Sequence, residues 1–405
     1  MSVLPFPGQT PDVAAPRCLN LRHNRAGCMR CADGCPTGAI RLENGAPTLD
    51  EATCVRCGLC VSICPTDVYT QPNSPEDRLA QVVAQVNVPV LALTCALHTE
   101  PGRSLAPGEL VVQHQRCLAA LGPAQLLALS DHGRRTLWLD DAPCAACVIG
   151  AARSHLAQVV NETNAWLGMG EQAAAVHLAT DACEPRNHLL ARRPVLDGSQ
   201  PKVSRRGLLG ALRAATRQAT RITERPNDAP ASEASSVYQR LPQRTPASRV
   251  DLLAQLAHLN LLGAEQIATT PLPVAAVQVD ESACSACGLC ARFCPTGALH
   301  FDVEDDRFAL VFQAAVCVDC AICVLACPEQ AIHLGDTLCP SALAAGYTET
   351  LVAGALTPCG ECGAPTAYAV SDDGGARCYA CRHGAGIVRS LRDGAGLMDD
   401  LLSRI

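Results

Sequence analysis

Cysteine is the residue type with the clearest chemical potential in this chain, which has 26 cysteines among 405 residues. Two runs near residue 300 share the spacing C-x2-C-x2-C-x3-C-P: Cys284, Cys287, Cys290, Cys294, and then Cys317, Cys320, Cys323, Cys327. This spacing predicts 4Fe–4S clusters, with three thiolates of a run around one cluster and the fourth reaching the other. We therefore expect one cluster on Cys284, Cys287, Cys290 and Cys327, and a second on Cys317, Cys320, Cys323 and Cys294.

An altered pair of runs lies near the N-terminus. The later run is complete, with Cys54, Cys57, Cys60 and Cys64, whereas the earlier run keeps Cys28, Cys31 and Cys35 but has Arg25 in the place of its first cysteine. Cys18 is the candidate replacement, because thiolate is the usual ligand; the alternatives are a 3Fe–4S cluster or ligation by His23. If the last cysteine of each run again binds the cluster of the other run, one cluster is predicted on Cys18, Cys28, Cys31 and Cys64, and another on Cys54, Cys57, Cys60 and Cys35.

The insertion between Cys18 and Cys28 is basic, with Arg22, His23 and Arg25. Positive charge beside a cluster favours its reduced form and would raise its potential. The alternative is a solvated loop without a role in the redox chemistry.

Further cysteines follow apolar stretches between residues 81 and 198. We expect strands over 88–94, 109–114, 135–139 and 175–179, with helices over 124–130 and 151–167. This alternation predicts a parallel sheet with helices over its faces, and the carboxyl ends of such strands meet at one edge. Cysteines come after each strand, namely Cys95, Cys117, Cys144 with Cys147, and Cys183. The hypothesis is a fifth cluster, 2Fe–2S or 4Fe–4S, on Cys95, Cys117, Cys144 and Cys147; the alternative is that these are buried core residues.

The C-terminal part contains two C-x2-C pairs, Cys359 with Cys362 and Cys378 with Cys381. Two such pairs predict a closed tetrahedral zinc site, which would be structural because it has no open position. Iron of the rubredoxin type takes the same four ligands and is the alternative. Cys339 stands alone and is expected to be a packed thiol.

Residues 199–272 are expected to form a basic helix over 202–225, a flexible connector over 226–249 and a short helix over 250–263. A basic amphipathic helix suits an acidic partner or an anionic membrane surface. The alternative is that this helix packs on its own protein.

Composition limits the class of protein. Only 3% of the residues are aromatic, so metal–thiolate bonds are expected to supply part of the folding free energy. The net charge of −7 does not favour nucleic-acid binding. No apolar run approaches 18 residues, and the first residues lack the pattern of a signal peptide. We expect a cytoplasmic protein with reduced thiols and no transmembrane segment, since structural disulfides would need an oxidising compartment.

The four runs of cysteines resemble those of dicluster ferredoxins and of cluster-bearing subunits of complex oxidoreductases. The strand-like pieces over 38–42 and 297–301 fit the hairpins that cover the clusters in that family. Residues 115–127, with the later C-x2-C pair, resemble the small iron–sulfur subunit of hydrogenase and heterodisulfide reductase systems. The expected fold is α+β and multidomain. Its parts are a ferredoxin module over 1–80, an α/β domain over 81–198, a basic helix and linker over 199–272, a second ferredoxin module over 273–336 and a zinc ribbon over 337–405.

The resemblance implies one-electron transfer. The sequence has no dinucleotide-binding fingerprint, no P-loop and no evident nucleophile–base pair. We therefore expect a non-catalytic electron-transfer subunit whose partners are an electron donor or acceptor protein and the catalytic subunit of a cytosolic redox enzyme, with molybdenum or tungsten enzymes as candidates. The alternative is an accessory factor that takes part in the maturation of a metalloenzyme. A redox sensor that acts on nucleic acid is disfavoured by the net negative charge of the chain.

Overall fold

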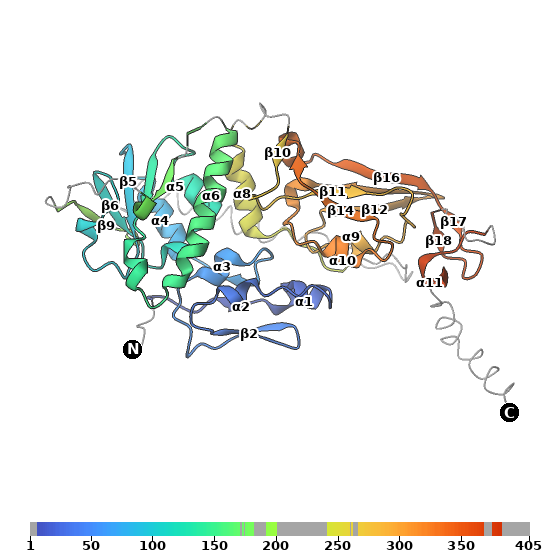
Figure 1. Ribbon diagram of the computed structural model, residues 1–405, viewed down its shortest axis with the longest axis horizontal. Coiled ribbons are helices and arrows are strands. Elements are labelled where there is room, and N and C mark those ends of the chain that lie inside the picture. Colours follow the sequence, from blue (N-terminus) through green and yellow to red (C-terminus); the bar gives the residue numbers. More distant parts are fainter. Residues whose placement is uncertain are drawn as a thin grey trace, which may run out of the picture.

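The computed structural model describes residues 6–170, 172–173, 175–181, 192–200, 241–259, 261, 266–367 and 375–382. Cys183, the expected basic helix over 202–225 and most of the expected connector lie outside these residues. Figure 1 shows a sheet with its helices at one end of the molecule, the N-terminal module below the middle, and the second module with the C-terminal hairpin at the other end.

The N-terminal module is built from short elements around its cysteines. Its strands are β1 (Asp12–Val13), β2 (Ile40–Glu43), β3 (Ala46–Leu49) and β4 (Tyr69–Thr70), and its helices are η1 (Ala15–Arg17), α1 (Leu19–Arg22), α2 (Arg30–Gly34) and α3 (Leu59–Ile63). Strands β2 and β3 form the expected hairpin, and β1 pairs with β4. Gly58 precedes α3 with φ of +84°, a left-handed conformation that glycine adopts without strain.

The central domain contains the expected parallel sheet. Its five strands, in the order β8-β7-β5-β6-β9, are β8 (Val176–Leu178), β7 (Thr136–Leu139), β5 (Val90–Thr94), β6 (Leu110–Gln113) and β9 (Val195–Asp197), and every neighbouring pair is parallel. The fifth strand, β9, was not predicted, because three residues give no readable alternation.

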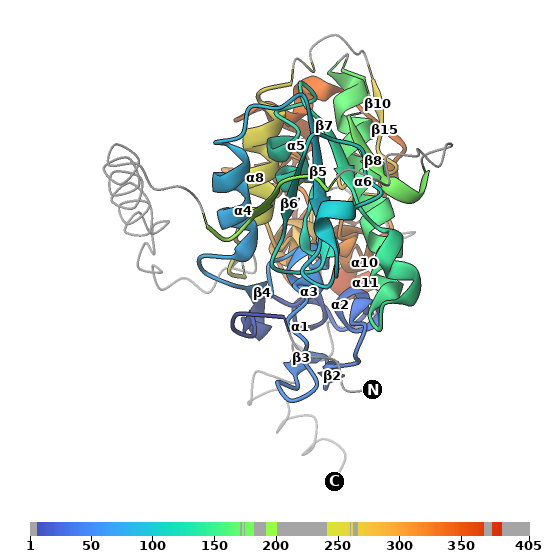
Figure 2. The same ribbon diagram turned by 90° about the vertical axis from the view of Figure 1, so that its left-hand side faces the viewer.

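The helices of this domain pack on one face of the sheet. They are the α-helices α4 (Pro75–Val83), α5 (Pro123–Leu129), α6 (Arg153–Met169) and α8 (Ala247–Leu256). The domain also has the short 3-10 turns η2 (Pro101–Arg103), η3 (Leu118–Ala120), η4 (Ala142–Ala146), η5 (Gly150–Ala152) and η6 (Ala179–Asp181). Leu91 and Leu93 belong to the large core formed with these helices, whereas Ala92 points to a small cluster on the opposite face. Figure 2 looks onto that opposite face. The expectation of helices over both faces is therefore wrong for the described residues.

The second module repeats the architecture of the first with longer strands. Its strands are β10 (Ile267–Ala268), β11 (Ala276–Val279), β12 (Leu299–Glu304), β13 (Arg307–Phe312), β14 (Ile332–Gly335) and β15 (Thr337–Leu338), and its helices are α9 (Leu289–Phe293), η8 (Ala314–Val316), α10 (Ile322–Ala326) and η9 (Pro340–Leu343). Strands β12 and β13 form the expected hairpin, β11 pairs with β14, and β10 pairs with β15.

The second module extends beyond residue 336, where the sequence placed its end. Strand β16 (Glu349–Ala355) pairs with the outer edge of β13 and makes a three-stranded sheet. The following hairpin of β17 (Thr357–Pro358) and β18 (Pro365–Thr366), with the short helix α11 (Tyr379–Arg382), carries the last four cysteines. The hydroxyl of Thr366 donates to the carbonyl of Ser285 at 3.0 Å, which ties this hairpin to the second module.

The segment over 241–256 is ordered and joins the modules, although residues up to 249 were expected to be part of a flexible connector. Helix α8 begins at Ala247, and the Asp67 carboxylate of the first module accepts from the Ser248 hydroxyl at 2.6 Å. Arg249 is 4% exposed and donates to carbonyls of the second module, with Nε 2.7 Å from the Ala315 oxygen. Arg249 donates hydrogen bonds to three carbonyls in all, and nothing in the sequence distinguishes such a buried arginine from a solvated one.

Candidate metal centres

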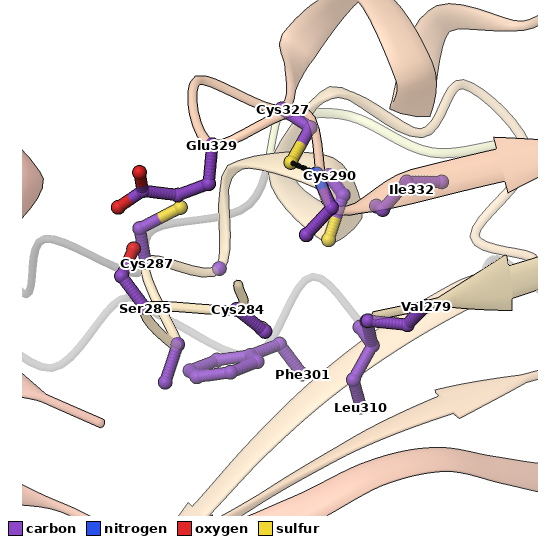
Figure 3. Close-up of a pocket in the computed structure, with 13 residues that line it drawn as sticks. Val279, Cys284, Ser285, Cys287, Cys290, Phe301, Leu310, Cys327, Glu329 and Ile332 are labelled. Carbon is purple, nitrogen blue, oxygen red and sulfur yellow. Dashed lines mark hydrogen bonds between the residues drawn. The ribbon is translucent and has the colours of Figure 1, made fainter. Parts of the chain in front are cut away.

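In the second module the eight cysteines divide into the two expected quartets. Cys284, Cys287, Cys290 and Cys327 line one cavity of about 20 Å³, and Cys294, Cys317, Cys320 and Cys323 line another of about 20 Å³. Figure 3 shows the first quartet, with Phe301, Leu310 and Ile332 as apolar walls around it and Glu329 beside Cys287. Such walls exclude water from the site.

The chemistry of the donor sets fits iron–sulfur clusters. Burial raises the pKa of the Cys317 thiol to about 12 and that of the Cys287 thiol to about 11, so four bare thiolates would not share either cavity. A positively charged metal core reverses this preference, because coordination deprotonates a thiol. The backbone N–H of Ala331 also donates to the sulfur of Cys327 at 3.3 Å, the kind of bond that sets cluster potentials.

The N-terminal module brings Cys18 to the place of the missing ligand. Cys18, Cys28, Cys31 and Cys64 line a cavity of about 20 Å³. The N–H of Val68 donates to the Cys64 sulfur at 3.4 Å, and this pair corresponds in position to Ala331 and Cys327 of the second module. The ring of His23 instead lies edge-on to that of Phe293, with centroids 5.2 Å apart. The geometry thus groups a thiol, not an imidazole, with the other three cysteines.

The fourth ferredoxin quartet lies next to the central domain. The thiols of Cys54, Cys57 and Cys35 all interact with that of Cys60, whose pKa is raised by burial and then by these neighbours. The guanidinium of Arg116 acts in the opposite direction on this quartet. Arg116 is 1% exposed, and sequence analysis did not identify it. It directly precedes Cys117, but nothing in the local pattern separates it from a solvated arginine.

The central cysteines converge at the carboxyl edge of the sheet, as the strand pattern predicted. Cys95, Cys117, Cys144 and Cys147 follow β5, β6 and β7 and line a single cavity of about 410 Å³. Burial raises the pKa of the Cys117 thiol to about 12, and an interaction with Cys57 also contributes to this rise. The central quartet therefore neighbours the quartet of Cys54, Cys57, Cys60 and Cys35.

The central cavity differs from the ferredoxin cavities in size and lining. Its volume is in the range of small-molecule pockets, and its walls include the apolar side chains of Phe6, Leu97 and Val148. His98 lies in the wall with Nε2 3.1 Å from the buried carboxylate of Asp140. Because the N–H of Glu100 donates to His98 Nδ1 at 3.2 Å, the proton of a neutral His98 lies on Nε2 and is donated to Asp140. His98 is thus held by the protein and does not join the quartet.

The last four cysteines form a tighter group. The sulfurs of Cys359, Cys362, Cys378 and Cys381 all lie within 4.8 Å of one another, and those of Cys362 and Cys378 are 3.6 Å apart. Four sulfurs at 2.3 Å from one tetrahedral ion would be about 3.8 Å apart, so the group fits a single ion. Within the described residues no other set of three or more such side chains approaches as closely. Cys339, expected to be a packed thiol, is exposed.

Comparisons with known proteins agree with the two modules. Residues 24–68 and 283–331 each match the family model of the 4Fe-4S dicluster domain. A stretch of 39 residues is 46% identical to a subunit of the ion-translocating oxidoreductase complex of Methanosarcina acetivorans, covering 10% of this chain and 15% of that protein. Another match, to an uncharacterized ferredoxin of Methanocaldococcus jannaschii, is 40% identical over 43 residues, covering 9% of this chain and 28% of that protein.

The chain therefore matches less than a third of the length of either relative. None of the helices in the described part of the chain has both the length and the apolarity needed to cross a membrane. Two dicluster domains with their cysteine quartets hold 4Fe–4S clusters, and such clusters carry single electrons. The chain therefore contains two 4Fe-4S dicluster domains, a kind of domain whose clusters transfer single electrons.

Proposed function

We propose that this protein is a relay subunit that carries electrons between a donor protein and the catalytic subunit of a cytosolic redox enzyme. The observation that carries the proposal is the succession of cysteine quartets along the molecule. The central quartet neighbours the quartet of Cys57, and the first module lies below the central domain and the second module and contacts both (Figure 1). A carrier that only diffuses would need one such module.

The proposed order of sites is supported by electrostatic interactions between residues at neighbouring quartets. Within the first module, Tyr69 interacts with cysteines of both quartets, Cys31 and Cys60. At the next step, Arg22 of the first module interacts with Cys294 and Cys320 of the second. Within the second module, Cys323 interacts with Cys290 of the neighbouring quartet. The order runs from the central site through the quartets of Cys57, Cys18 and Cys294 to that of Cys284.

The proposed ligand sets are the five quartets described above, with 4Fe–4S clusters in the four ferredoxin sites and a fifth iron–sulfur cluster in the central site. Each cluster accepts one electron and passes it on. The protein holds the thiolates, excludes water with apolar walls such as Phe301 and Leu310, and sets potentials through N–H bonds to sulfur. We assign the ribbon one structural zinc ion.

We assign the exchange of electrons with a partner to the central site, because its cavity alone among the four described is of ligand-pocket size. Its rim carries apolar side chains in solvent, since Val148 is 55% and Leu97 is 37% exposed. Partnership with further subunits is supported by the relative named as a subunit of an oxidoreductase complex. A molybdenum- or tungsten-dependent enzyme is the proposed acceptor or donor.

The test compares the anaerobically purified wild type with the Cys144→Ser variant. Iron and sulfide analysis should give roughly 18 to 20 irons for wild type, and the variant should lose the central cluster and retain roughly 16. Low-temperature EPR after reduction should show one signal missing in the variant. The matched control is Cys339→Ser, which changes an exposed thiol outside every quartet and should leave iron and EPR unchanged.

The relay itself is tested by reducing the protein in substoichiometric steps. Electrons added one at a time should distribute over all clusters according to their potentials within the time of mixing. An unchanged iron content in Cys144→Ser would remove the central cluster from the proposal. Clusters of one module that stay oxidised while those of the other are reduced, despite matched potentials, would contradict the relay.

A further inference from the structure

The basic insertion that separates Cys18 from the other cysteines of the first run is docked on the second module. The guanidinium of Arg22 donates to carbonyls of that module, with Nε 3.0 Å from the Phe293 oxygen and Nη2 2.8 Å from the Cys294 oxygen, and its Nη1 lies 2.6 Å from the Pro242 oxygen of the segment before α8. His23 lies edge-on against the ring of Phe293. Arg25, which occupies the place of the missing cysteine, donates to the Leu325 carbonyl. The insertion is therefore an ordered contact and not a solvated loop.

The insertion begins at Cys18, which is a proposed cluster ligand. The N–H of Arg22 donates to the carbonyl of Cys18 at 3.1 Å, and the helix α1 between them fixes the direction of the side chain. Asn20 closes the loop: its Nδ2 donates to the Cys28 carbonyl at 2.7 Å, and its Oδ1 accepts from the Cys28 N–H at 2.8 Å. Two hydrogen bonds and one side chain thus connect Cys18 with Cys294, ligands of different modules.

The guanidinium also places positive charge at the second module's nearest quartet. Arg22 interacts electrostatically with Cys294 and Cys320, which line the same cavity. A positive charge near a cluster stabilises its reduced form, which carries one more negative charge. Arginine suits this position because its planar fork can satisfy several carbonyls at once, whereas lysine offers a point charge.

A second connection holds the modules independently of the insertion. The Asp67 carboxylate accepts from Ser248 at the start of α8, and Arg249 on the same helix donates to the carbonyls of Ala314 and Ala315. These carbonyls precede Cys317 in the chain. Loss of Arg22 would therefore loosen one contact without separating the modules, so the variant can be purified and compared.

We propose that residues 18–28 form the electron-transfer junction between the two ferredoxin modules, with Arg22 as its positioning residue. In this transfer a cluster of one module is oxidised by one electron, and a cluster of the other module is reduced by the same electron. The inference rests on the proposed relay. It adds that the insertion in the first cysteine run is the segment through which electrons pass between the two modules.

The experiment compares three substitutions of Arg22 in the full, cluster-loaded chain. Arg22→Lys keeps the charge but not the three-way donation, Arg22→Gln keeps one donor group without the charge, and Arg22→Ala removes both. Arg41→Gln is the matched control, because Arg41 is an exposed arginine of the same module on the β2 hairpin. Iron content is measured first and should equal that of wild type in all four variants.

Four readouts then separate geometry from charge. The EPR spin–spin interaction between reduced clusters of the two modules should weaken in all Arg22 variants. The rate of electron redistribution between modules should fall about tenfold or more in Arg22→Ala, which corresponds to about 1.4 kcal/mol of activation free energy. The midpoint potential of the cluster in the Cys294 quartet should fall in Arg22→Gln and Arg22→Ala and stay near wild type in Arg22→Lys. Hydrogen exchange of residues 19–28 should accelerate in Arg22→Ala and not in Arg41→Gln.

Each outcome bears on one proposal. Wild-type redistribution, interaction and potentials in all Arg22 variants would overturn the junction while leaving the relay in place. Absence of redistribution between modules in the wild type itself would overturn the relay, whatever the variants do.

Discussion

The buried guanidinium of Arg116 forms an ion pair with the Glu76 carboxylate, with Nη1 and Oε2 3.4 Å apart. The same carboxylate is 3.2 Å from Nε2 of the fully buried His114. Burial alone would raise the pKa of Glu76, but the hydrogen bond from His114 and the charge of Arg116 outweigh it and hold the pKa below its usual value. Arg116 also contributes positive charge to the Cys54, Cys57 and Cys60 thiols. The ion pair therefore lies where the central domain meets the quartet of Cys54, Cys57, Cys60 and Cys35.

Replacing Arg116 by Met should destabilise the protein by about 3–5 kcal/mol, because it leaves the Glu76 carboxylate buried without its cation. Chemical unfolding of the cluster-loaded protein under anaerobic conditions measures this loss. The double variant Arg116→Met with Glu76→Gln should recover part of it, since the buried charge is then gone. Equal stabilities of the single and double variants would show that the charge of Glu76 is not the cause.

Gly58→Ala should destabilise the contact between the N-terminal module and the central domain by roughly 1–3 kcal/mol. A Cβ at this position would lie 2.8 Å from the Cβ of Ala120 and 2.9 Å from Nη1 of Arg116, and φ is +84°. Gly38→Ala is the matched control, because Gly38 also has a positive φ, +66°, but nothing within 4 Å of an added Cβ. A thermal unfolding comparison should show the larger loss in Gly58→Ala; equal losses would mean that backbone strain alone matters.

Cys18→Ser should convert or abolish one cluster of the N-terminal module. The thiol of Cys18 lines the same cavity as Cys28, Cys31 and Cys64, and a serine hydroxyl is a poor substitute for thiolate. Iron analysis should therefore give roughly one to four irons fewer than in wild type. His23→Ala is the comparison that addresses the imidazole alternative and should leave the iron content unchanged. Wild-type iron in Cys18→Ser would contradict the assignment of this ligand.

Glu162 should make the protein less stable as the pH rises toward neutrality. Burial raises the pKa of this α6 carboxyl to about 7, and one of its oxygens, Oε1, has no hydrogen-bond partner. The folded state therefore holds a proton that the unfolded chain releases near pH 4.3, so stability is lost between about pH 4.3 and 7, on the order of 3 kcal/mol in all. Glu162→Gln should remove this dependence in unfolding experiments at pH 5 and 8, whereas Glu51→Gln, at an exposed site, should retain it. Parallel pH profiles for wild type and Glu162→Gln would refute the assignment.

The C-terminal ribbon should bind one zinc ion in the purified protein. Burial would raise the pKa of the Cys359 thiol, but backbone N–H groups of Cys378, Cys362 and Glu361 lower it below its usual value and prepare a thiolate. Metal analysis should show one zinc per chain, lost in Cys362→Ser without loss of cluster iron. Because the ribbon is tied to Ser285 by Thr366, hydrogen exchange near Ser285 should also increase. One additional iron with the spectrum of a rubredoxin-type site would contradict zinc.

The cysteine spacing was sufficient to predict the ferredoxin modules and the grouping of their cysteines. Three ligands of one cluster lie within seven positions of the chain, as in Cys284, Cys287 and Cys290, so local geometry alone keeps them together. The parallel sheet was also readable, because most of its strands are apolar runs and β5, β6 and β7 are each followed by cysteines at the same edge. The hairpins of both modules followed from the resemblance.

Only the tertiary structure decided how these parts meet. Arg22 and Cys294 are 272 positions apart, and Arg249 binds carbonyls 65 and 66 positions away. Such contacts depend on the docking of whole modules, whose free energy is spread over many residues and leaves no local pattern. For the same reason the one-sided packing of the helices, the addition of β16 to the second module and the burial of Arg116 were not predicted. The sequence by itself predicts which residues can bind metal, because ligand spacing is local. The proposed order of the sites could come only from the fold, because it depends on long-range contacts.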